Sequence, residues 1–316
     1  MTLEDLREAQ QGLAGIAVRT PLVDIPELAA LAGVPVYLKL ESRQPTGAFK
    51  LRGAWTALRR LPPEQRARGV ITYSSGNHGQ ALAYAAQRMG VRAVIVMPET
   101  ATRAKVEGVK RWAGEVVLAG TTSEQRYEKA AALARSDGLT VIPPFDHRDV
   151  IAGQATVGLE IVEQLPDVAE VATPVGGGGL AAGIALALGA VRPSARLTTV
   201  EPEGSAALAA ALKAGKPVRL ERTHSVADGL LPLSVGALNF AILKNVARPA
   251  LVSESAIVEA TRWLYYEKGL VVEPSGAVTA AAVRSRVFRP RGPTVLVVSG
   301  GNIDPATIEG LVPLPV

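Results

Sequence analysis

The strongest fold signal in this chain is the stretch Glu170-Val171-Ala172-Thr173-Pro174-Val175-Gly176-Gly177-Gly178-Gly179-Leu180-Ala181. It predicts a short buried strand over 170–173, then a glycine turn, then a helix that begins at Leu180. Consecutive glycines let several backbone N–H groups converge, and the helix N-terminus behind them favours a bound phosphate. The alternative is a tight turn where the helix packs closely on the sheet. Four glycines in a row exceed what one turn needs, so we favour phosphate binding.

Strand and helix patterns alternate along the rest of the chain. The other predicted strands are 36–41, 70–73, 93–97, 116–118, 140–142, 196–200 and 294–299. The predicted helices include 51–61, 80–88, 102–112, 123–136, 150–164 and 180–190. This alternation predicts an α/β fold with mainly parallel sheets and helices on both faces. Ligands of such folds bind beyond the carboxyl ends of the strands, where glycine-rich turns gather.

The composition is that of an ordinary globular protein. The 316 residues are 48% hydrophobic and 20% charged, which predicts about two domains with a large core. The absence of cysteine excludes disulfides, thiolate metal ligands and a cysteine nucleophile. The segment 1–10 is acidic and amphipathic, unlike a secretory signal, and the apolar stretch 168–191 is interrupted by Pro174 and glycines. We therefore expect a cytoplasmic protein of the size of an enzyme, without a membrane partner.

The charge of the chain is positive, with a formal net charge of +5 and an isoelectric point of about 9.5. Four arginines lie close together near the C-terminus: Arg284, Arg286, Arg289 and Arg291. They would suit a phosphate or a nucleic acid. We favour a solvated helix end and turn, because no stacking aromatics accompany them, and we expect no nucleic-acid partner. The abundance of arginine and proline and the lack of cysteine point to a thermophilic source.

Two further turns carry polar side chains at predicted helix N-termini. Ser74-Ser75-Gly76-Asn77-His78-Gly79 follows the strand 70–73 and offers two hydroxyls, an amide and an imidazole. Such a turn suits a substrate carboxylate, although a single Ser or Asn there would be an ordinary helix cap. Lys50 follows Pro45-Thr46-Gly47-Ala48-Phe49 at the start of another helix. A solvated lysine is the simplest interpretation, but a desolvated Lys50 would lose its proton and form a Schiff base.

Five motifs occur in order: Thr46-Gly47-Ala48-Phe49-Lys50-Leu51-Arg52-Gly53-Ala54, Ser74-Ser75-Gly76-Asn77-His78-Gly79-Gln80-Ala81, Gly176–Gly179, Glu273-Pro274-Ser275-Gly276 and Ser299-Gly300-Gly301-Asn302. Together they resemble the serine/threonine dehydratase and serine racemase family, over about residues 15–304. The resemblance implies the two-domain, fold-type-II (tryptophan-synthase-β-like) fold of pyridoxal-phosphate enzymes. It implies a large domain of residues 1–58 and 147–316 and a small domain of residues 69–146, with the cofactor between them. It also implies a homodimer or homotetramer.

The resemblance implies a role for each site residue. Lys50 would form the Schiff base with pyridoxal 5'-phosphate, and Phe49 would pack beside the cofactor ring. Asn77 would bond the ring hydroxyl, and Ser299 would face the pyridine nitrogen. The cofactor phosphate would lie in the turn formed by Gly176, Gly177, Gly178 and Gly179. The substrate carboxylate would be received by Ser74, Ser75, Asn77 and His78.

The activity implied by the resemblance is β-elimination of water and ammonia from L-threonine or L-serine, with Lys50 as the base. Serine racemisation is the nearest alternative, since Ser75 occupies the place of a second acid/base on the opposite face of the cofactor. Phe145 is similar to the dehydratases, where racemases have an asparagine. β-Replacement ranks lower, because those enzymes typically have Lys-Asp-Arg where this chain has Lys50-Leu51-Arg52. A phosphate- or nucleotide-binding module without catalysis is the alternative of a different class.

A metal site is implied only in part. The racemases hold a divalent cation with a glutamate, a backbone carbonyl and an aspartate. Here Glu201 and the carbonyl of Ser205 match the first two, but Ala207 stands at the aspartate position. The sequence therefore predicts at most weak binding of Ca²⁺ or Mg²⁺. A glutamate that only caps the following helix is the alternative.

Overall fold

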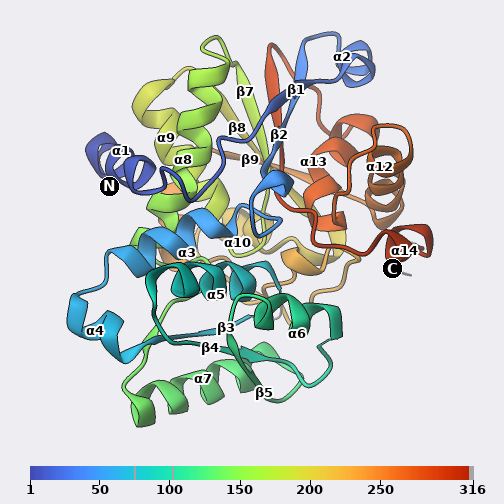
Figure 1. The fold of residues 1–316 in the computed structure, drawn as a ribbon. Helices are drawn as coiled ribbons and strands as arrows, with labels where there is room; N and C mark the ends of the chain where they lie inside the picture. Colours follow the sequence, from blue (N-terminus) through green and yellow to red (C-terminus); the bar gives the residue numbers. More distant parts are fainter. Residues whose placement is uncertain (75, 102, 313–316) are drawn as a thin grey trace.

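Two sheets, mostly of parallel strands, organise the chain (Figure 1). The computed structural model describes residues 1–74, 76–101 and 103–312. The larger sheet has the order β1 (Leu22–Asp24), β2 (Val36–Leu40), β10 (Thr294–Val298), β7 (Glu170–Pro174), β8 (Arg196–Pro202) and β9 (Ala247–Val252). Its strands are parallel except for β1, which pairs antiparallel with β2. The smaller sheet is parallel throughout, in the order β5 (Glu115–Leu118), β4 (Ala93–Met97), β3 (Val70–Tyr73) and β6 (Thr140–Val141).

Helices cover both faces of the larger sheet. On one face lie α8 (Arg148–Gln164), α9 (Gly179–Val191), α10 (Ala207–Ala214) and α11 (Ala237–Leu243), and on the other lie α2 (Pro26–Ala32), α12 (Glu254–Tyr266) and α13 (Pro274–Arg284). Alternate residues of β10 serve the two cores, since Val295 and Val297 face α8 and α9 whereas Leu296 and Val298 face α12 and α13. The predicted α/β fold with helices on both faces is therefore confirmed.

The smaller sheet is covered in the same way. One face packs on α3 (Lys50–Arg59) and α5 (Asn77–Met89), and the other on α7 (Ser123–Asp137). The remaining helices are α1 (Leu3–Gly12), α4 (Pro63–Arg68), α6 (Arg103–Lys110) and α14 (Pro305–Glu309). Within the described parts of the chain, no helix is long and apolar enough to cross a bilayer.

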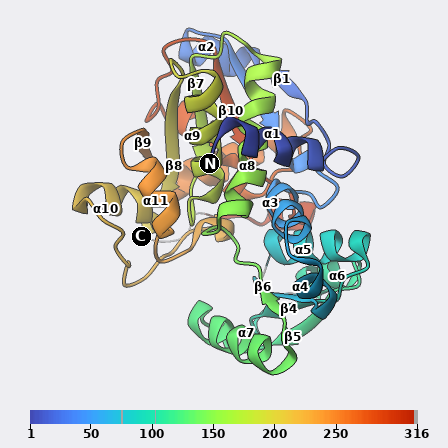
Figure 2. The same ribbon diagram turned by 90° about the vertical axis from the view of Figure 1, so that its left-hand side faces the viewer.

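The strands of the smaller sheet all fall within the segment predicted as the small domain. Helix α3 lies at the junction, where it packs on α5 on one side and on α8 on the other (Figure 2). The division at residues 58 and 147 stays a prediction. The sequence did not identify β1 or β9, because β1 is only three residues long and β9 is a largely exposed edge strand that contains Pro249.

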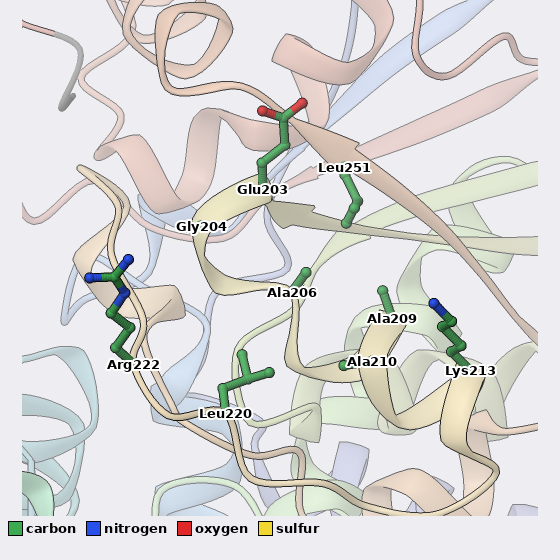
Figure 3. Close-up of a pocket in the computed structure, with 9 residues that line it drawn as sticks. All are labelled: Glu203, Gly204, Ala206, Ala209, Ala210, Lys213, Leu220, Arg222 and Leu251. Atoms are coloured by element: carbon green, nitrogen blue, oxygen red, sulfur yellow. The ribbon is translucent and has the colours of Figure 1, made fainter. Parts of the chain in front are cut away.

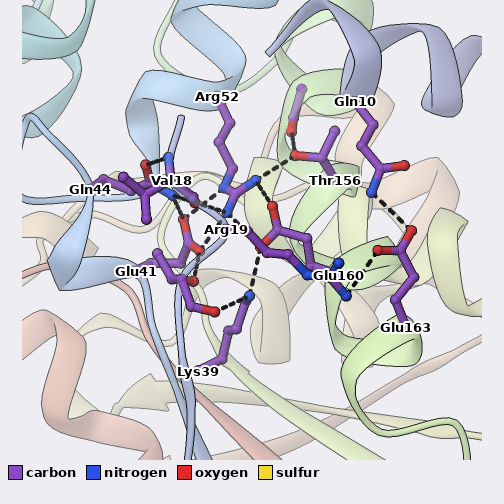
Figure 4. Close-up of polar contacts among 12 residues, drawn as sticks. Gln10, Val18, Arg19, Lys39, Glu41, Gln44, Arg52, Thr156, Glu160 and Glu163 are labelled. Carbon is purple, nitrogen blue, oxygen red and sulfur yellow. Dashed lines mark hydrogen bonds and ion pairs between the residues drawn. The ribbon is translucent and has the colours of Figure 1, made fainter. Parts of the chain in front are cut away.

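A buried group of charges fixes α3 in the fold (Figure 4). We call Lys39, Glu41, Arg52 and Glu160 the Arg52 cluster. Arg52 is 1% exposed, and its guanidinium forms two-pronged contacts with both carboxylates, at 2.8 Å to each oxygen of Glu41 and 2.7 and 2.9 Å to those of Glu160. Lys39 Nζ donates to Glu160 at 2.6 Å. Two cations and two anions thus balance where no bulk water reaches them, and they tie α3 to β2 and α8.

We expect Arg52→Ala to unfold at much lower denaturant, because it leaves Glu41 and Glu160 buried without their main partner. Removing one member of a buried ion pair typically costs about 3–5 kcal/mol of the free energy of unfolding. Urea denaturation measures the change. The control is Arg19→Ala, which removes the exposed pair with Glu163 and should cost less than about 1 kcal/mol. Similar losses in both variants would contradict this account of the cluster.

Candidate active site

Lys50 lies beyond the carboxyl end of β10, a central strand of the larger sheet. The turn before α3 is attached to that strand end: the N–H of Phe49 donates to the carbonyl of Ser299 at 3.0 Å, and Ala48 pairs with Gly300 as an isolated bridge. The first residue of α3 is Lys50 itself. The structure therefore brings the predicted residues Phe49, Lys50 and Ser299 together at the edge of the sheet where ligands of parallel sheets bind.

The surroundings of Lys50 favour loss of its proton. Burial lowers the pKa of the amine from 10.5 to about 8, and the charge of Glu273 acts in the opposite direction. Its Nζ donates to the carbonyl of Pro144 at 2.7 Å and lies 5.2 Å from the centroid of the Phe49 ring. A lysine with a pKa near 8 has a substantial neutral fraction close to physiological pH, and the neutral amine is a nucleophile and a base.

The four glycines form an open cup of backbone donors after β7. The N–H groups of Gly176, Gly177 and Gly178 reach no acceptor in the described parts of the chain, and the first turn of α9 follows them. The cup is braced from behind, since the carbonyl of Gly177 accepts from the N–H of Gly236 at 3.1 Å and from Asn239 Nδ2 at 2.7 Å. This donor set fits a phosphate group.

Phe145 closes one side of this cup. A Cβ built on Gly177 would lie 2.2 Å from a carbon of the Phe145 ring, so only glycine allows the ring to lie there. The same segment supplies Pro144, the acceptor for Lys50. The turn 144–146 therefore touches both the lysine and the glycine cup. Phe145 was identified from the sequence as a residue similar to the dehydratases, but its contact with Gly177 was not predicted.

Asn77 is held by hydrogen bonds on both ends of its side-chain amide. Its Nδ2 donates to Glu273 Oε1 at 2.6 Å, and its Oδ1 accepts from Asn302 Nδ2 at 2.7 Å. Asn302 also donates to the carbonyl of Thr46 at 2.8 Å. Gly47 makes room for it, with a φ of +72° and a Cβ position only 2.1 Å from Asn302 Oδ1. The second N–H of the Asn77 amide has no acceptor among the described residues, and such a free donor is what a ring hydroxyl would need.

Glu273 and Asn302 are the site residues that sequence reasoning missed. Both stand in motifs that carry the family resemblance, but the sequence assigned no role to either. Glu273 is 7% exposed, and burial, with the charge of Asp228, raises its pKa to about 7. The sequence signal for both residues was their place in motifs that resemble the family. Their contact with Asn77 could not be predicted, because neither residue lies near Asn77 along the chain.

The predicted carboxylate loop is described except for Ser75, which lies outside the described residues. Ser74 Oγ accepts from the N–H of Gly76 at 3.4 Å. His78 is 1% exposed, and its Nε2 lies 3.1 Å from the carbonyl of Ile142. Burial and the charge of Lys50 lower the pKa of His78 to about 3, so its ring is neutral. Nε2 must therefore carry the proton that bonds Ile142, which leaves Nδ1 as an acceptor. The carboxylate-binding roles of the loop residues Ser74, Ser75, Asn77 and His78 stay predictions.

The predicted metal residues take part in local structure. Glu201 accepts from the N–H groups of Leu208 and Ala209, at 2.7 and 2.9 Å, and so caps α10. Burial raises the pKa of Glu201 to about 7, although these bonds oppose the rise. Ser205 Oγ donates to the carbonyl of Leu230 at 2.6 Å.

The neighbouring Glu203 lines an open hollow of about 410 Å³ and points away from the alanines of α10 (Figure 3). Across the described residues, no group of three or more histidine or acidic side chains could hold a metal.

Comparison with known proteins identifies the family of this chain. The family model described as "Pyridoxal-phosphate dependent enzyme" matches residues 14–300. The L-threonine ammonia-lyase of Thermotoga maritima is 38% identical over 313 residues, which cover 99% of this chain and 78% of that protein. Maize serine racemase superposes with a TM-score of 0.94 at 36% identity, covering 98% of this chain and 96% of the other. The T.th. threonine deaminase superposes with a TM-score of 0.90 at 40% identity, covering 96% of this chain and 99% of the other. This chain therefore belongs to the family of pyridoxal-phosphate-dependent enzymes.

Proposed function

We propose that this protein is an ammonia-lyase that removes water and ammonia from L-threonine or L-serine, giving 2-oxobutanoate or pyruvate. The observation that carries the proposal is Lys50, a half-buried lysine with a pKa of about 8. Its amine contacts the turn 144–146, which also packs on the donor cup that fits a phosphate. Relatives named threonine ammonia-lyase and threonine deaminase, at 38% and 40% identity, support the same reaction. Incubation with L-threonine and L-serine, with measurement of the oxo acid released, tests it.

The residues present would hold pyridoxal phosphate at four points. Lys50 would bind its aldehyde carbon, and the glycine cup 176–179 its phosphate. Asn77 would give its free N–H to the ring hydroxyl, and Ser299 would face the ring nitrogen. When bound, the cofactor supplies an acceptor for the negative charge that develops when the substrate loses its α-proton.

Lys50 then acts as the base. With the cofactor bonded to the substrate amine instead, the Lys50 amine would be free to take the α-proton, and its lowered pKa keeps a usable fraction neutral. The proposed donors to the substrate carboxylate are Ser74, Ser75 and the backbone N–H of Asn77, since both N–H bonds of the Asn77 side chain are then in use. Because His78 uses its Nε2 proton on Ile142, we propose that it acts by holding the first turn of α5 in place.

Serine racemisation is the second candidate. Its support is the TM-score of 0.94 with maize serine racemase, and the proposed second acid/base is Ser75. A racemase must return a proton from the face opposite Lys50, whereas a dehydratase need not. A steady-state assay with L-threonine, L-serine and D-serine, which measures the oxo acid and the serine enantiomers together, separates the two activities.

Further properties stay predictions from the sequence. They are weak binding of Ca²⁺ or Mg²⁺ at Glu201 and the Ser205 carbonyl, a homodimer or homotetramer, a cytoplasmic location and a thermophilic source. The capping bonds that Glu201 makes to α10 support the alternative in which it serves the helix.

We expect Lys50→Ala to lose the visible absorbance of the lysine-bound cofactor and nearly all turnover. The reason is that the covalent bond to the cofactor and the base are the same amine. Absorbance spectra and oxo-acid assays measure both. Lys213→Ala, an exposed lysine on α10, is the control and should behave as the parent protein. A Lys50→Ala protein that keeps both properties would refute the assignment.

The reaction of the apoprotein with pyridoxal phosphate should accelerate with rising pH and level off above about pH 8. Only the neutral amine attacks the aldehyde, and burial places the pKa of Lys50 at about 8. Stopped-flow absorbance at a series of pH values gives the midpoint. Glu273→Gln should lower the midpoint, because the carboxylate raises the pKa of Lys50. A midpoint near 10.5, the ordinary value for lysine, would contradict this.

Gly177→Ala should weaken cofactor binding about tenfold or more, because the new Cβ would lie 2.2 Å from the Phe145 ring and overpacking costs about 1–3 kcal/mol. Equilibrium dialysis measures the affinity. The matched control is Gly189→Ala on the helix that follows the cup, where no atom lies within 4 Å of the added Cβ. Adding Phe145→Ala to Gly177→Ala should recover part of the loss. Equal affinities for the two glycine variants would show that the cup does not hold the phosphate.

A further inference from the structure

Four arginines surround a small pocket at the amino ends of β7, β8 and β9. They are Arg196, Arg248, Arg289 and Arg291, and the pocket has a volume of about 180 Å³. Arg196 is the first residue of β8, and Arg248 the second of β9. Lys50 and the glycine cup lie beyond the carboxyl ends of the same sheet. The pocket is therefore at the opposite end of the sheet from the proposed active site.

None of these four guanidinium groups lies within ion-pair distance of a carboxylate in the part of the chain that the structure describes. Glu170 is the one acidic residue in the pocket lining; it is 5% exposed and its Oε1 accepts from Thr198 Oγ1 at 2.9 Å. The wall thus carries four positive charges and one negative charge. Such an excess in a recess attracts an anion.

The arginine run near the C-terminus divides into two parts. Arg284 makes a cation–π contact within the fold, since its guanidinium carbon lies 4.6 Å from the centroid of the Trp263 ring. Arg289 and Arg291 line the pocket instead, together with two arginines from strands far away in the sequence. Arg289 and Arg291 are exposed, as the solvated turn favoured from the sequence requires, but they also share one recess with arginines from two other segments.

The pocket is held rigidly. Phe288 is 7% exposed, and its N–H donates to the carbonyl of Ala282 at 3.0 Å. Pro290, between the two loop arginines, is buried and restricts the backbone on both sides. The carbonyl of Pro293 accepts from the N–H of Ala169 at 2.8 Å, which ties the loop to the start of β7. A site whose backbone is already ordered loses less entropy when a ligand binds.

We propose that this pocket binds the phosphate group of a small phosphorylated molecule. The planar guanidinium presents paired donors that match phosphate oxygens, and several arginines together neutralise its charge. Pockets for whole small molecules usually measure about 300–1,000 Å³. At about 180 Å³ this one takes a phosphate or diphosphate group and leaves the rest of the ligand outside. A nucleic acid is less suited, because the aromatic ring in the lining, that of Phe288, is buried and offers no stacking surface.

The test uses holoenzyme whose cofactor has been fixed to Lys50 by borohydride, so that the glycine cup stays filled. Isothermal titration with pyrophosphate and with inorganic phosphate, at constant ionic strength set by chloride, should show one saturable site per chain. Arg289→Ala/Arg291→Ala should weaken binding about tenfold or more, since a hydrogen bond to a charged group contributes about 1.5–3 kcal/mol. The matched control is Arg286→Ala/Arg88→Ala, which removes the same charge from two exposed positions outside the pocket.

Three results would overturn the proposal. The first is no saturable binding of either anion to the parent protein. The second is equal binding by the pocket variant and the control variant. The third is that a short single-stranded oligonucleotide binds through Arg289 and Arg291 while pyrophosphate does not. If the double variant fails to fold, Arg248→Gln removes one charge from the exposed edge strand and must weaken binding instead.

Discussion

The contact between Arg52 and two buried carboxylates sets the position of α3, the helix that begins at the proposed catalytic residue Lys50. Glu41 and Glu160 lie on either side of the guanidinium, and Lys39 completes the balance of charge. Because an unpaired charge in this place would cost several kcal/mol, α3 has one position in which every group is satisfied. Lys50 begins the same helix, so the ion cluster also fixes where its amine emerges, beyond the carboxyl end of β10.

The site is built where the helices of the two sheets meet. Asn77 begins α5 beside the smaller sheet, whereas Glu273 directly precedes α13 and Asn302 follows β10 of the larger sheet. The hydrogen bonds among these three side chains therefore span the junction. Phe145 also spans the junction: it follows β6 of the smaller sheet, and its ring packs on the glycine cup of the larger sheet. Movement of one sheet relative to the other would change the cup and the Asn77 amide together.

The sequence predicted what local patterns determine. The strands of the sheet interiors, the glycine turn and the start of α3 follow from periodicity and turn chemistry over a few residues. The partners could not be predicted in this way, because they are far apart along the chain: Asn77 and Glu273 are 196 residues apart, and Arg52 and Glu160 are 108. The arginine run is a similar case, since only the fold shows that Arg289 and Arg291 join Arg196 and Arg248. Edge strand β9 was missed because its exposed side chains lack a buried pattern.

Burial has opposite consequences for the two ionisable groups that flank the site. It lowers the pKa of Lys50 to about 8, which favours the neutral amine that the proposed chemistry needs. It raises the pKa of Glu273 to about 7, which favours the neutral acid. Each charged form would stabilise the other, so the carboxylate limits how far the pKa of Lys50 falls. An apolar residue at position 273 would remove that limit but would leave the Asn77 amide without its acceptor. The glutamate therefore fixes the orientation of the Asn77 amide, and at the same time it keeps the pKa of Lys50 higher than burial alone would.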